Sequence, residues 1–453
     1  MLTINESLFS ADYFDQQYAL FDSLSWLPPE QERGQAMAVC LAETACWLAL
    51  CFYAKTNNLT VMPIVWGTPK ETAQKMAEKA GCNSLIFADI QHPIALTPKQ
   101  NPSLSTGLIQ MSSGTTGEPK CICRSWQEID REIASYTQHF PEANNMQPVV
   151  ACPVTHSYGL ICGVLVTLAR GQAPVIVNNI NPKFLVKILK LYPKPLLYCS
   201  PTMLATMIRF WPQHNKLHAV MTSGTVMSQT TFELLSPQIT HMLQQYGCSE
   251  AGCVSMSKAM SAPNDLGTPL PHMKISSSNI SHQPKEIIIT MQGNGSEDVK
   301  TIHTQDMGYT TLDTQGKTSL RFVSRMDDTI IVAGFNVYPQ EIEDIILAHP
   351  HIADVVVFKV NDQHAGQRVA LQYVADIAIS PHDLRAWCQT KLASYQVPQY
   401  LEPLTQIARL ANGKINRKQI SLNFSLSQTN IPTDKHTAQL KPSMQAKTEG
   451  VQS

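Results

Sequence analysis

The alternation of apolar and polar positions predicts strands and helices in turn over the first part of the chain. An apolar run covers residues 36–54, and we expect it to form one buried helix. A membrane span is disfavoured because Glu43 lies near its middle and Ala and Cys outnumber Leu and Ile. The pattern then predicts a strand over Thr60–Val65, a polar helix over Lys70–Ala80 and a strand over Ser84–Phe87. Strands that alternate with helices favour a parallel sheet with crossover connections, and therefore an α/β fold.

The second half of the chain has fewer regular patterns. A strand is predicted over Glu286–Thr290, between flanks rich in Ser, Asn and Gly that we expect to be exposed loops. Pro339 and the acidic residues after it predict the start of a helix, because proline fits the first turn and carboxylates favour the dipole-positive end. A strand over Asp354–Val360 and a helix over Leu384–Leu392 follow. Beyond Asn423 the residues are polar with few large apolar side chains, which is typical of a disordered tail.

Composition and charge narrow the function classes. The 453 residues are enough for two or three domains with a large core. The formal net charge of -1 gives no bulk field that would favour nucleic acid or an anionic membrane. The 12 cysteines lack the paired spacing of zinc sites, and the first residues lack the basic-then-apolar pattern of a signal peptide. We therefore expect a reduced, cytoplasmic protein without a nucleic-acid partner or stable membrane insertion.

The stretch Gln110–Lys120 is the strongest candidate for chemistry. Its two glycines allow positive φ and close backbone approach, so successive N–H groups can form a concave site for an anion. Four hydroxyls and the Lys120 ammonium add donors, although the spacing differs from G-x-x-x-x-G-K-[ST]. Apolar residues on both sides predict a hairpin-type flap between strands, and Ser125 with Glu128 forms a capping box for the next helix. A phosphate-binding loop and a flexible surface loop are both compatible with these residues.

The whole phrase Ser-Ser-Gly-Thr-Thr-Gly-Glu-Pro-Lys at 112–120 resembles the phosphate-loop signature of the adenylate-forming superfamily. That superfamily contains acyl- and aryl-CoA ligases, luciferases and the adenylation domains of peptide synthetases. Three later stretches resemble further motifs in the same order: 245–250 with Tyr-Gly-Cys-Ser-Glu, the hinge stretch 325–343, and 413–417 with Gly-Lys-Ile-Asn-Arg. The resemblance covers roughly Trp47 to Arg417.

The chain departs from the superfamily pattern at four substituted positions, before the final lysine motif, where Ile407-Ala408-Arg409 stand in place of a segment with the usual Pro, and at its start. Ser249 stands where Thr is usual, Gln305 and Ser324 where Gly is usual, and Ile331 where Lys is usual. Gln305 is expected to alter its turn, because it tolerates positive φ less well than Gly. The stretch before the first matching segment is shortened.

The resemblance implies the superfamily's α/β fold: a large multi-layer N-terminal domain with parallel sheets, and a small α+β C-terminal domain. We expect the large, N-terminally shortened AMP-binding domain over 1–323, a small mobile domain over 324–424 and a disordered tail over 425–453.

The resemblance also implies a two-step reaction. A carboxylate attacks the α-phosphate of ATP and releases pyrophosphate, and a thiol then takes the acyl group from the adenylate. Lys414 is the implied catalytic lysine, Glu250 the Mg²⁺ ligand, Asp327 the hinge and Gly334 part of the thiol tunnel. The residues implied for ATP and phosphate binding are Ser112, Ser113, Gly114, Thr115, Thr116, Gly117, Lys120, Tyr246, Ser249, Asp306 and Arg325.

A separate set of residues is implied for the acyl pocket. His156 matches a motif whose side chain stands at the acyl group, so it is also a catalytic candidate, although a lone histidine is by itself compatible with a core position. The other pocket residues implied are Tyr158, Ser223, Gly224 and Gly247. Amino-acid-activating members hold the substrate amine with an Asp in this segment, whereas Ser157 stands about there in this chain. An unpaired buried ammonium is costly, so an α-amino acid is a poor candidate.

Three functions remain compatible with the sequence besides the favoured one. The favoured function is an ATP-dependent ligase with Mg²⁺ that joins a small carboxylic acid to CoA. One alternative acceptor is the phosphopantetheine of an acyl-carrier protein. A catalytically degenerate AMP-binding relic and a structural α/β protein are the other two alternatives.

Overall fold

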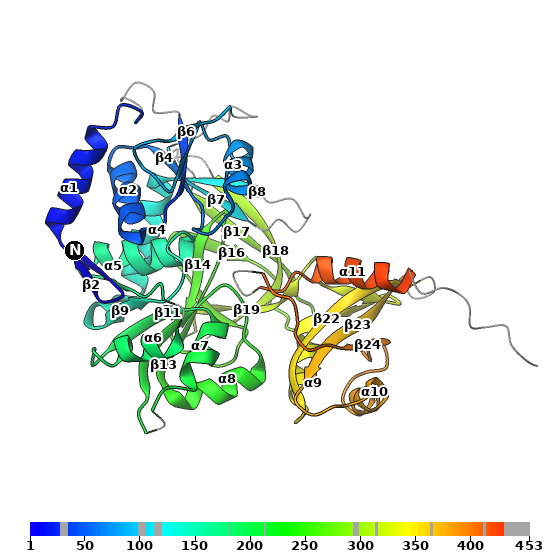
Figure 1. Ribbon diagram of the computed structural model, residues 1–453. Coiled ribbons are helices and arrows are strands. Elements are labelled where there is room, and N and C mark those ends of the chain that lie inside the picture. The colour runs from blue at the N-terminus through cyan, green and yellow to red at the C-terminus, as the bar shows by residue number, and fades with distance from the viewer. Residues whose placement is uncertain are drawn as a thin grey trace, which may run out of the picture.

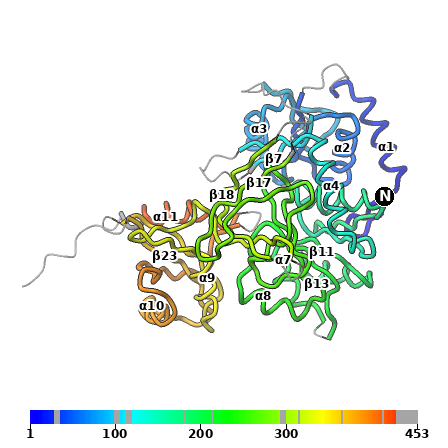
Figure 2. The backbone as a smooth tube through the Cα atoms, turned by 180° about the vertical axis from the view of Figure 1, so that it is seen from behind, coloured from blue at the N-terminus to red at the C-terminus, as the bar shows by residue number. Residues whose placement is uncertain are grey.

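The computed structural model describes residues 1–27, 35–97, 106–112, 120–179, 181–212, 214–292, 299–312, 316–362, 366–410 and 414–429. The described chain forms a large body and a smaller one beside it, the latter coloured yellow to red in Figure 1 and seen from behind in Figure 2. Sheets with helices packed against them make up both bodies, which confirms the predicted α/β class. None of the described helices is long and apolar enough to cross a membrane.

A six-stranded sheet carries the candidate phosphate loop at one edge. Its strand order is β6-β5-β3-β4-β7-β8, with parallel pairs in the centre and antiparallel pairs at both edges. Helices α2 and α3 provide its crossover connections. The strands are β3 (Ala36–Cys40), β4 (Thr60–Pro63), β5 (Ser84–Phe87), β6 (Ile94–Ala95), β7 (Gly107–Ser112) and β8 (Lys120–Ser125), and the helices are α2 (Thr44–Thr56) and α3 (Lys70–Lys79).

The prediction of one helix over residues 36–54 was wrong. The run divides into β3 and α2, and Glu43 is the N-cap residue of the helix. All five residues of β3 are buried, because the strand lies between two parallel neighbours in the sheet. A strand buried on both faces shows no polar alternation, so its sequence looks like the start of the apolar helix that follows.

A thirteen-stranded sheet forms the rest of the large body. Its order is β16-β17-β18-β19-β15-β14-β13-β12-β11-β9-β10-β1-β2. The strands are parallel from β13 to β1 and antiparallel at both ends, from β16 to β13 and between β1 and β2. The strands are β1 (Leu2–Ile4), β2 (Ser7–Phe9), β9 (Gln147–Val150), β10 (Val175–Ile176), β11 (Pro195–Cys199), β12 (Leu217–Thr222), β13 (Ile239–Cys248), β14 (Gly252–Ser257), β15 (Asp265–Pro269), β16 (Met273–Ser276), β17 (Lys285–Gln292), β18 (Val299–Leu312) and β19 (Thr318–Arg325).

Part of the region expected to be loops is strand. The Ser- and Asn-rich flank before residue 286 contains β15 and β16, which pair with β19 and β17. Short strands of this kind obtain their stability from neighbours distant in sequence, so local composition gives a poor signal. The helices of the large body are α1 (Ala11–Asp22), α4 (Trp126–His139), η2 (Pro141–Asn145), the π-helix η3 (Tyr158–Leu165), α5 (Val166–Ala169), α6 (Pro182–Leu189), α7 (Pro201–Ile208), α8 (Gln229–Leu235) and η4 (Ser236–Gln238).

The small body begins after Arg325 and has a five-stranded sheet of its own. Strand order is β21-β20-β23-β22, with β24 parallel to β23. Its elements are β20 (Ile330–Val332), β21 (Phe335–Val337), α9 (Pro339–Leu347), β22 (Ile352–Asp362), β23 (Gly366–Ala375), α10 (Pro381–Gln389), β24 (Tyr400–Pro403) and α11 (Arg417–Thr429). Helix α11 continues five residues past the boundary expected at 424; residues 430–453 lie outside the described residues.

The apolar clusters of the two bodies are separate. Each cluster of described apolar side chains lies entirely within residues 2–322 or within residues 330–424. A hydrogen bond joins the bodies where the Gln229 N–H donates to Asp344 Oδ1 at 3.1 Å, between α8 and α9. Burial raises the pKa of Asp344.

Candidate active site

The candidate phosphate loop connects two antiparallel strands. Strands β7 and β8 pair in register with Ser112 opposite Lys120, so the expected flap between strands is confirmed. Lys120 is exposed at the first position of β8. The capping box is also confirmed: Ser125 Oγ accepts from the Glu128 N–H, and the Glu128 carboxylate accepts from the Ser125 N–H at 2.9 Å. The predicted loop residues Ser113, Gly114, Thr115, Thr116 and Gly117, and the side chain of Ser112, lie outside the described residues.

Three of the predicted nucleotide-binding residues form one hydrogen-bonded chain. The Tyr246 hydroxyl on β13 donates to Asp306 Oδ2 at 2.6 Å, and Arg325 Nη1 donates to Asp306 Oδ1 at 2.9 Å. Asp306 on β18 and Arg325 on β19 are directly opposite each other in the sheet. Burial raises the pKa of Asp306, and the Arg325 guanidinium opposes that shift. These strands therefore bring together residues separated by up to 79 positions in the sequence.

Lys414 lies near this chain although it belongs to the small body. It is half-buried, and burial lowers its pKa, whereas the Asp306 carboxylate raises it. The Lys414 charge also reaches His156 in the large body. Surrounding protein lowers the pKa of that solvent-exposed imidazole by desolvation, and the lysine lowers it further. The Lys414 charge, from the small body, therefore acts on both Asp306 and His156 of the large body.

The predicted hinge residue lies in a turn between the bodies. Asp327 follows β19, and the Asp328 N–H donates back to the Arg325 carbonyl at 3.2 Å. Arg325 Nε donates to Asp327 Oδ1 at 3.3 Å, and the Lys359 ammonium donates to the Asp327 carbonyl. Arg417 pairs with Asp328 at 3.3 Å and so links the turn to α11. Charged groups of the small body therefore hold the turn that contains the predicted hinge residue.

Gly334 occupies the exposed end of the β20–β21 hairpin. Its φ of +88° follows a φ of +48° at Ala333, so the tip is a left-handed turn. A Cβ added at Gly334 would meet no atom within 4 Å, so there is space for a side chain. The positive φ is therefore the reason that glycine is favoured at this position.

Gln305 lies inside β18, at the irregular register with β17, and has positive φ although it stands where Gly is usual. Gln305 has a φ of +60°, its N–H donates to Glu286 Oε1 at 2.9 Å and its carbonyl accepts from the Met326 N–H at 2.7 Å. These bonds hold a conformation that a non-glycine residue adopts at a cost of about 1–2 kcal/mol. Hydrogen bonds at both its N–H and its carbonyl hold Gln305 in this conformation, and the expectation that it alters the local backbone stays a prediction.

The five predicted acyl-pocket residues come from three segments. The Tyr158 hydroxyl, at the start of η3, donates to the Met221 carbonyl at 2.5 Å, which ties that segment to β12. Ser223 and Gly224 follow β12, and Ser223 Oγ donates to the Gln245 carbonyl at 3.2 Å. Gly224 has a φ of +94°. These contacts tie Tyr158 to β12 and Ser223 to β13, the strand that carries Tyr246.

Gly247 has a packing reason to be glycine. A Cβ there would lie less than 3.0 Å from the Gly252 carbonyl oxygen, at the irregular register between β13 and β14. This close approach of two backbones requires glycine at position 247 whether or not the residue also lines the acyl pocket.

Glu250 and Ser249 lie in the short turn between β13 and β14, and both are half-buried. Within the described residues the Glu250 carboxylate has no hydrogen bond or ion pair. Its backbone carbonyl accepts from Lys300 Nζ at 3.2 Å. A carboxylate without a protein cation fits Mg²⁺, which prefers oxygen ligands shared with phosphates. Lys300 was not predicted as a site residue, because it lies in the flank after the predicted strand 286–290, which was expected to be an exposed loop.

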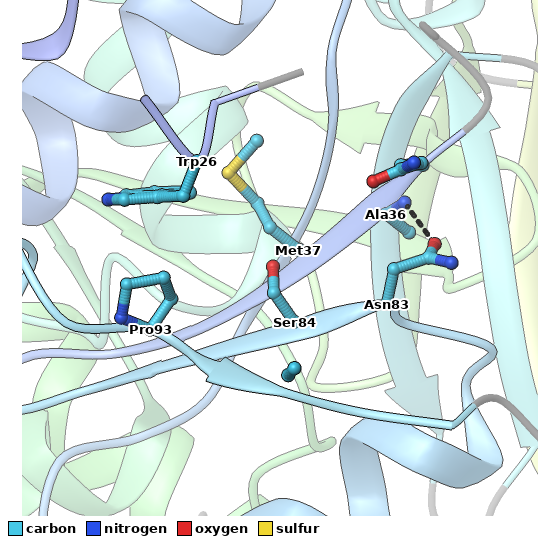
Figure 3. Close-up of a pocket in the computed structure, with 8 residues that line it drawn as sticks. Trp26, Ala36, Met37, Asn83, Ser84 and Pro93 are labelled. Carbon is cyan, nitrogen blue, oxygen red and sulfur yellow. Dashed lines mark hydrogen bonds between the residues drawn. The ribbon is translucent and has the colours of Figure 1, made fainter. Parts of the chain in front are cut away.

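A pocket of about 270 Å³ lies elsewhere, at the edge of the six-stranded sheet (Figure 3). None of the predicted site residues lines it. Its lining residues are Trp26, Gln35, Ala36, Met37, Asn83, Ser84, Pro93 and Ala95.

Comparisons with known proteins agree on one enzyme family. A family model described as AMP-binding enzyme matches residues 96–284, and one described as AMP-binding enzyme C-terminal domain matches residues 341–414. A 3,4-dihydroxybenzoate–[aryl-carrier protein] ligase of Bacillus anthracis is 36% identical over 93% of this chain and 99% of its own length.

Solved structures have the same fold at low identity. ATP-bound MatB from Rhodopseudomonas palustris has a TM-score of 0.77 at 16% identity, covering 93% of this chain and 95% of its own. O-succinylbenzoate coenzyme A synthetase (MenE) from Bacillus subtilis, in complex with ATP and magnesium ion, has a TM-score of 0.72 at 19% identity, covering 92% and 95%.

Proposed function

Because this chain belongs to the AMP-binding family of adenylate-forming enzymes and is an ATP-dependent acid–thiol ligase, we propose that it activates an aromatic carboxylic acid and loads it onto a carrier protein. The relative whose name states a dihydroxybenzoate and an aryl-carrier protein matches almost end to end at 36% identity. The CoA synthetase among the structural neighbours is only 19% identical and therefore supports the fold alone. CoA, the acceptor favoured from the sequence, becomes the second candidate.

The observation that carries the proposed chemistry is the hydrogen-bonded chain Tyr246–Asp306–Arg325, together with the Lys414 charge, which acts on the pKa of both Asp306 and His156. A carboxylate and a triphosphate repel each other, so their reaction needs positive charge aimed where negative charge develops. In this proposal the Lys414 ammonium binds the substrate carboxylate and an α-phosphate oxygen together. The carboxylate oxygen then bonds to the α-phosphorus, and the bond to pyrophosphate breaks.

The remaining residues hold ATP in this proposal. The loop 112–120 binds the pyrophosphate end, and Asp306 and Arg325 bind the ribose hydroxyls. The Tyr246 ring, whose hydroxyl is fixed by Asp306 at 2.6 Å, stacks on the purine beside Ser249. Mg²⁺ held by Glu250 supplies charge neutralisation for the phosphates.

The acyl group lies between His156 and Tyr158 on one side and Ser223, Gly224 and Gly247 on the other in this proposal. No carboxylate occupies position 157, where an amino-acid substrate would need a partner for its ammonium. An acid without an α-amino group is therefore the proposed substrate class.

The second step needs access for a thiol. We place the hinge at Asp327, so that rotation of the small domain (324–424) removes Lys414 from the site and brings the tip at Gly334 towards it. A phosphopantetheine thiol then attacks the acyl carbon, its proton is lost, and AMP leaves. The free state of all twelve cysteines agrees with a cytoplasmic setting, and no cysteine is needed in either step.

A relic without activity is the less favoured candidate. Gln305, one of the departures from the superfamily pattern, has a positive φ inside β18, next to Asp306. The Tyr246–Asp306–Arg325 chain is also intact.

The test begins with ATP–pyrophosphate exchange over a panel of hydroxybenzoates, short and long fatty acids, and amino acids. We expect exchange with an aromatic acid and none with amino acids. The active acid is then offered to a phosphopantetheinylated aryl-carrier protein, to its unmodified form as control, and to CoA, with the thioester measured by mass spectrometry. Thioester on CoA but not on the carrier protein would overturn the proposed acceptor. Absence of exchange with every acid would favour the relic.

A further inference from the structure

We propose that Arg124 and Glu132 are positioning residues for adenylation, because they hold the turn that carries Ser249 and Glu250 against the strand that leads out of the phosphate loop. This inference rests on the proposed role of that turn in binding Mg-ATP. Neither residue touches the proposed substrates; both act through the backbone.

The two side chains form a deeply buried ion pair. Arg124 on β8 is 2% exposed and Glu132 on α4 is 1% exposed, with Nη2 and Oε2 2.7 Å apart. Such a pair is weak evidence of a role in stability, since well-packed apolar side chains in its place are often as stable. Because the ion pair lies next to the turn proposed to bind Mg-ATP, we assign it the role of positioning that turn.

The pair lies directly against the backbone where the turn ends. Glu132 Oε1 accepts from the Cys253 N–H at 2.7 Å. The preceding residue, Gly252, has a φ of +78°, and a Cβ there would lie less than 3.0 Å from both Glu132 and Arg124. Gly252 and Cys253 are the first residues of β14, so the pair fixes the position at which the chain leaves the turn.

A second contact holds the same turn from its other side. Lys300 Nζ donates to the Glu250 carbonyl at 3.2 Å and to Glu128 Oε1 at 3.3 Å. Glu128 and Glu132 are four residues apart and therefore lie on one face of α4. That helix starts directly after β8, whose first residue is Lys120. One helix thus fixes the metal-binding turn relative to the end of the phosphate loop.

The consequence is a specific effect on Mg-ATP. Loss of the acceptor for the Cys253 N–H releases the turn and displaces Glu250, while the Tyr246–Asp306–Arg325 chain keeps its own contacts. Groups that orient a metal ligand typically change metal affinity or activity by about 10- to 100-fold when removed.

Two variants separate positioning from stability. Arg124→Met/Glu132→Met replaces the pair by apolar side chains of similar length and removes the acceptor of the Cys253 N–H, so the apo melting temperature should fall only by the cost of that one unpaired N–H, which is less than the cost of an unpaired buried charge. We expect the Mg²⁺ concentration for half-maximal pyrophosphate exchange to rise about 10- to 100-fold. Glu132→Gln should do the opposite: it keeps an acceptor for the N–H but leaves Arg124 unpaired, so the melting temperature falls and the Mg²⁺ requirement changes little.

A second readout does not depend on turnover. The Mg²⁺-dependent part of the melting-temperature rise with ATP should be lost in the double variant and kept in Glu132→Gln. Trp126→Phe is the matched control, because it removes a buried hydrogen bond from α4 to the Leu59 carbonyl without touching the turn. That control should lower the melting temperature and leave the Mg²⁺ requirement unchanged.

The outcomes distinguish this inference from the proposed function. A wild-type Mg²⁺ requirement and thermal shift in the double variant would refute positioning even if the enzyme is active. If the double variant does not fold, Lys300→Met tests the other contact, and a wild-type Mg²⁺ requirement there would refute the inference. If the wild type shows no exchange with any acid, the proposed function fails, and the Mg-ATP thermal shift still decides whether the pair positions the turn.

Discussion

Replacing Lys414 with Ala should lower adenylate formation by about 10²- to 10³-fold, the scale of losing one oriented donor at a transition state. The variant should fold normally. Asp306 is the carboxylate that raises the pKa of Lys414. Its hydrogen bonds from Arg325 Nη1 at 2.9 Å and from the Tyr246 hydroxyl at 2.6 Å do not involve the lysine and should remain in the variant. The loss is therefore expected in the rate of the first step and not in the melting temperature.

The magnitude follows from the surroundings of the ammonium. At an effective dielectric constant of about 20, a unit charge about 3 Å from an oxyanion contributes about 5 kcal/mol. Lys414 is half-buried and attracted to Asp306, so part of this energy is already present before the transition state. The part of this energy that is gained only in the transition state should then be about 2.7–4 kcal/mol, which corresponds to the 10²- to 10³-fold loss in rate.

The assay compares the two half-reactions. Pyrophosphate exchange reports adenylation, and a preformed acyl-adenylate offered to the thiol reports transfer. Lys418→Ala, at an exposed lysine four residues away, is the control and should retain both rates. Equal loss of both half-reactions in Lys414→Ala would refute the assigned role.

The pH dependence gives an independent check on the same residue. Burial lowers the pKa of Lys414 below its ordinary value of 10.5, and the charged form is the one the reaction needs. Adenylation should therefore fall as pH rises through the lowered pKa. Lys414→Arg keeps a charge at high pH, so its residual activity should lack that alkaline decline. An unchanged alkaline limb in Lys414→Arg would assign the decline to another group.

Three further predictions concern other parts of the molecule. Asp327→Pro places proline third in the Arg325–Asp328 turn, where it disfavours the present backbone, so exchange should fall more than thiol transfer; wild-type rates in both would refute the hinge. Glu250→Gln should keep the apo melting temperature and lose most exchange, with partial rescue by raised Mg²⁺; an unfolded variant would make the carboxylate structural. Burial and two arginines lower the pKa of His272 from 6.5 to about 4, so its neutral form stabilises the fold above pH 6.5 and that stability is lost as pH falls towards 4. The loss between pH 7 and 5 is at most about 2 kcal/mol, since the ring is only partly buried, and urea unfolding of His272→Met should show a smaller loss than wild type.

Local signals in the sequence predicted local structure well. Strand β5 has the predicted bounds Ser84–Phe87, and the capping box at Ser125 and Glu128 is present. Both depend only on residues within a few positions of one another. The order of the motifs was likewise sufficient for the family and the fold.

Features that depend on distant partners could not be predicted. Strand β3 was read as helix, because burial between two parallel neighbours removes the alternation that marks a strand. Gly247 was assigned to a pocket, whereas its close approach to Gly252 depends on the irregular register of a hairpin. Lys300, Arg124 and Glu132 carry no local signal at all, since their contacts are made across sheets and helices.

The separate apolar cores of the two bodies have a consequence for the proposed rotation of the small domain. Because no apolar cluster of the described residues joins the two bodies, a rotation of the small domain need not expose either core to water. In the proposed rotation, the balance between the two orientations would depend on polar contacts such as that between Gln229 and Asp344. One such bond is worth about 0.5–1.5 kcal/mol, so its loss shifts the ratio of the two orientations about two- to tenfold. A single substitution at a contact between the two bodies can therefore change which half-reaction limits turnover, without changing any residue of the proposed active site.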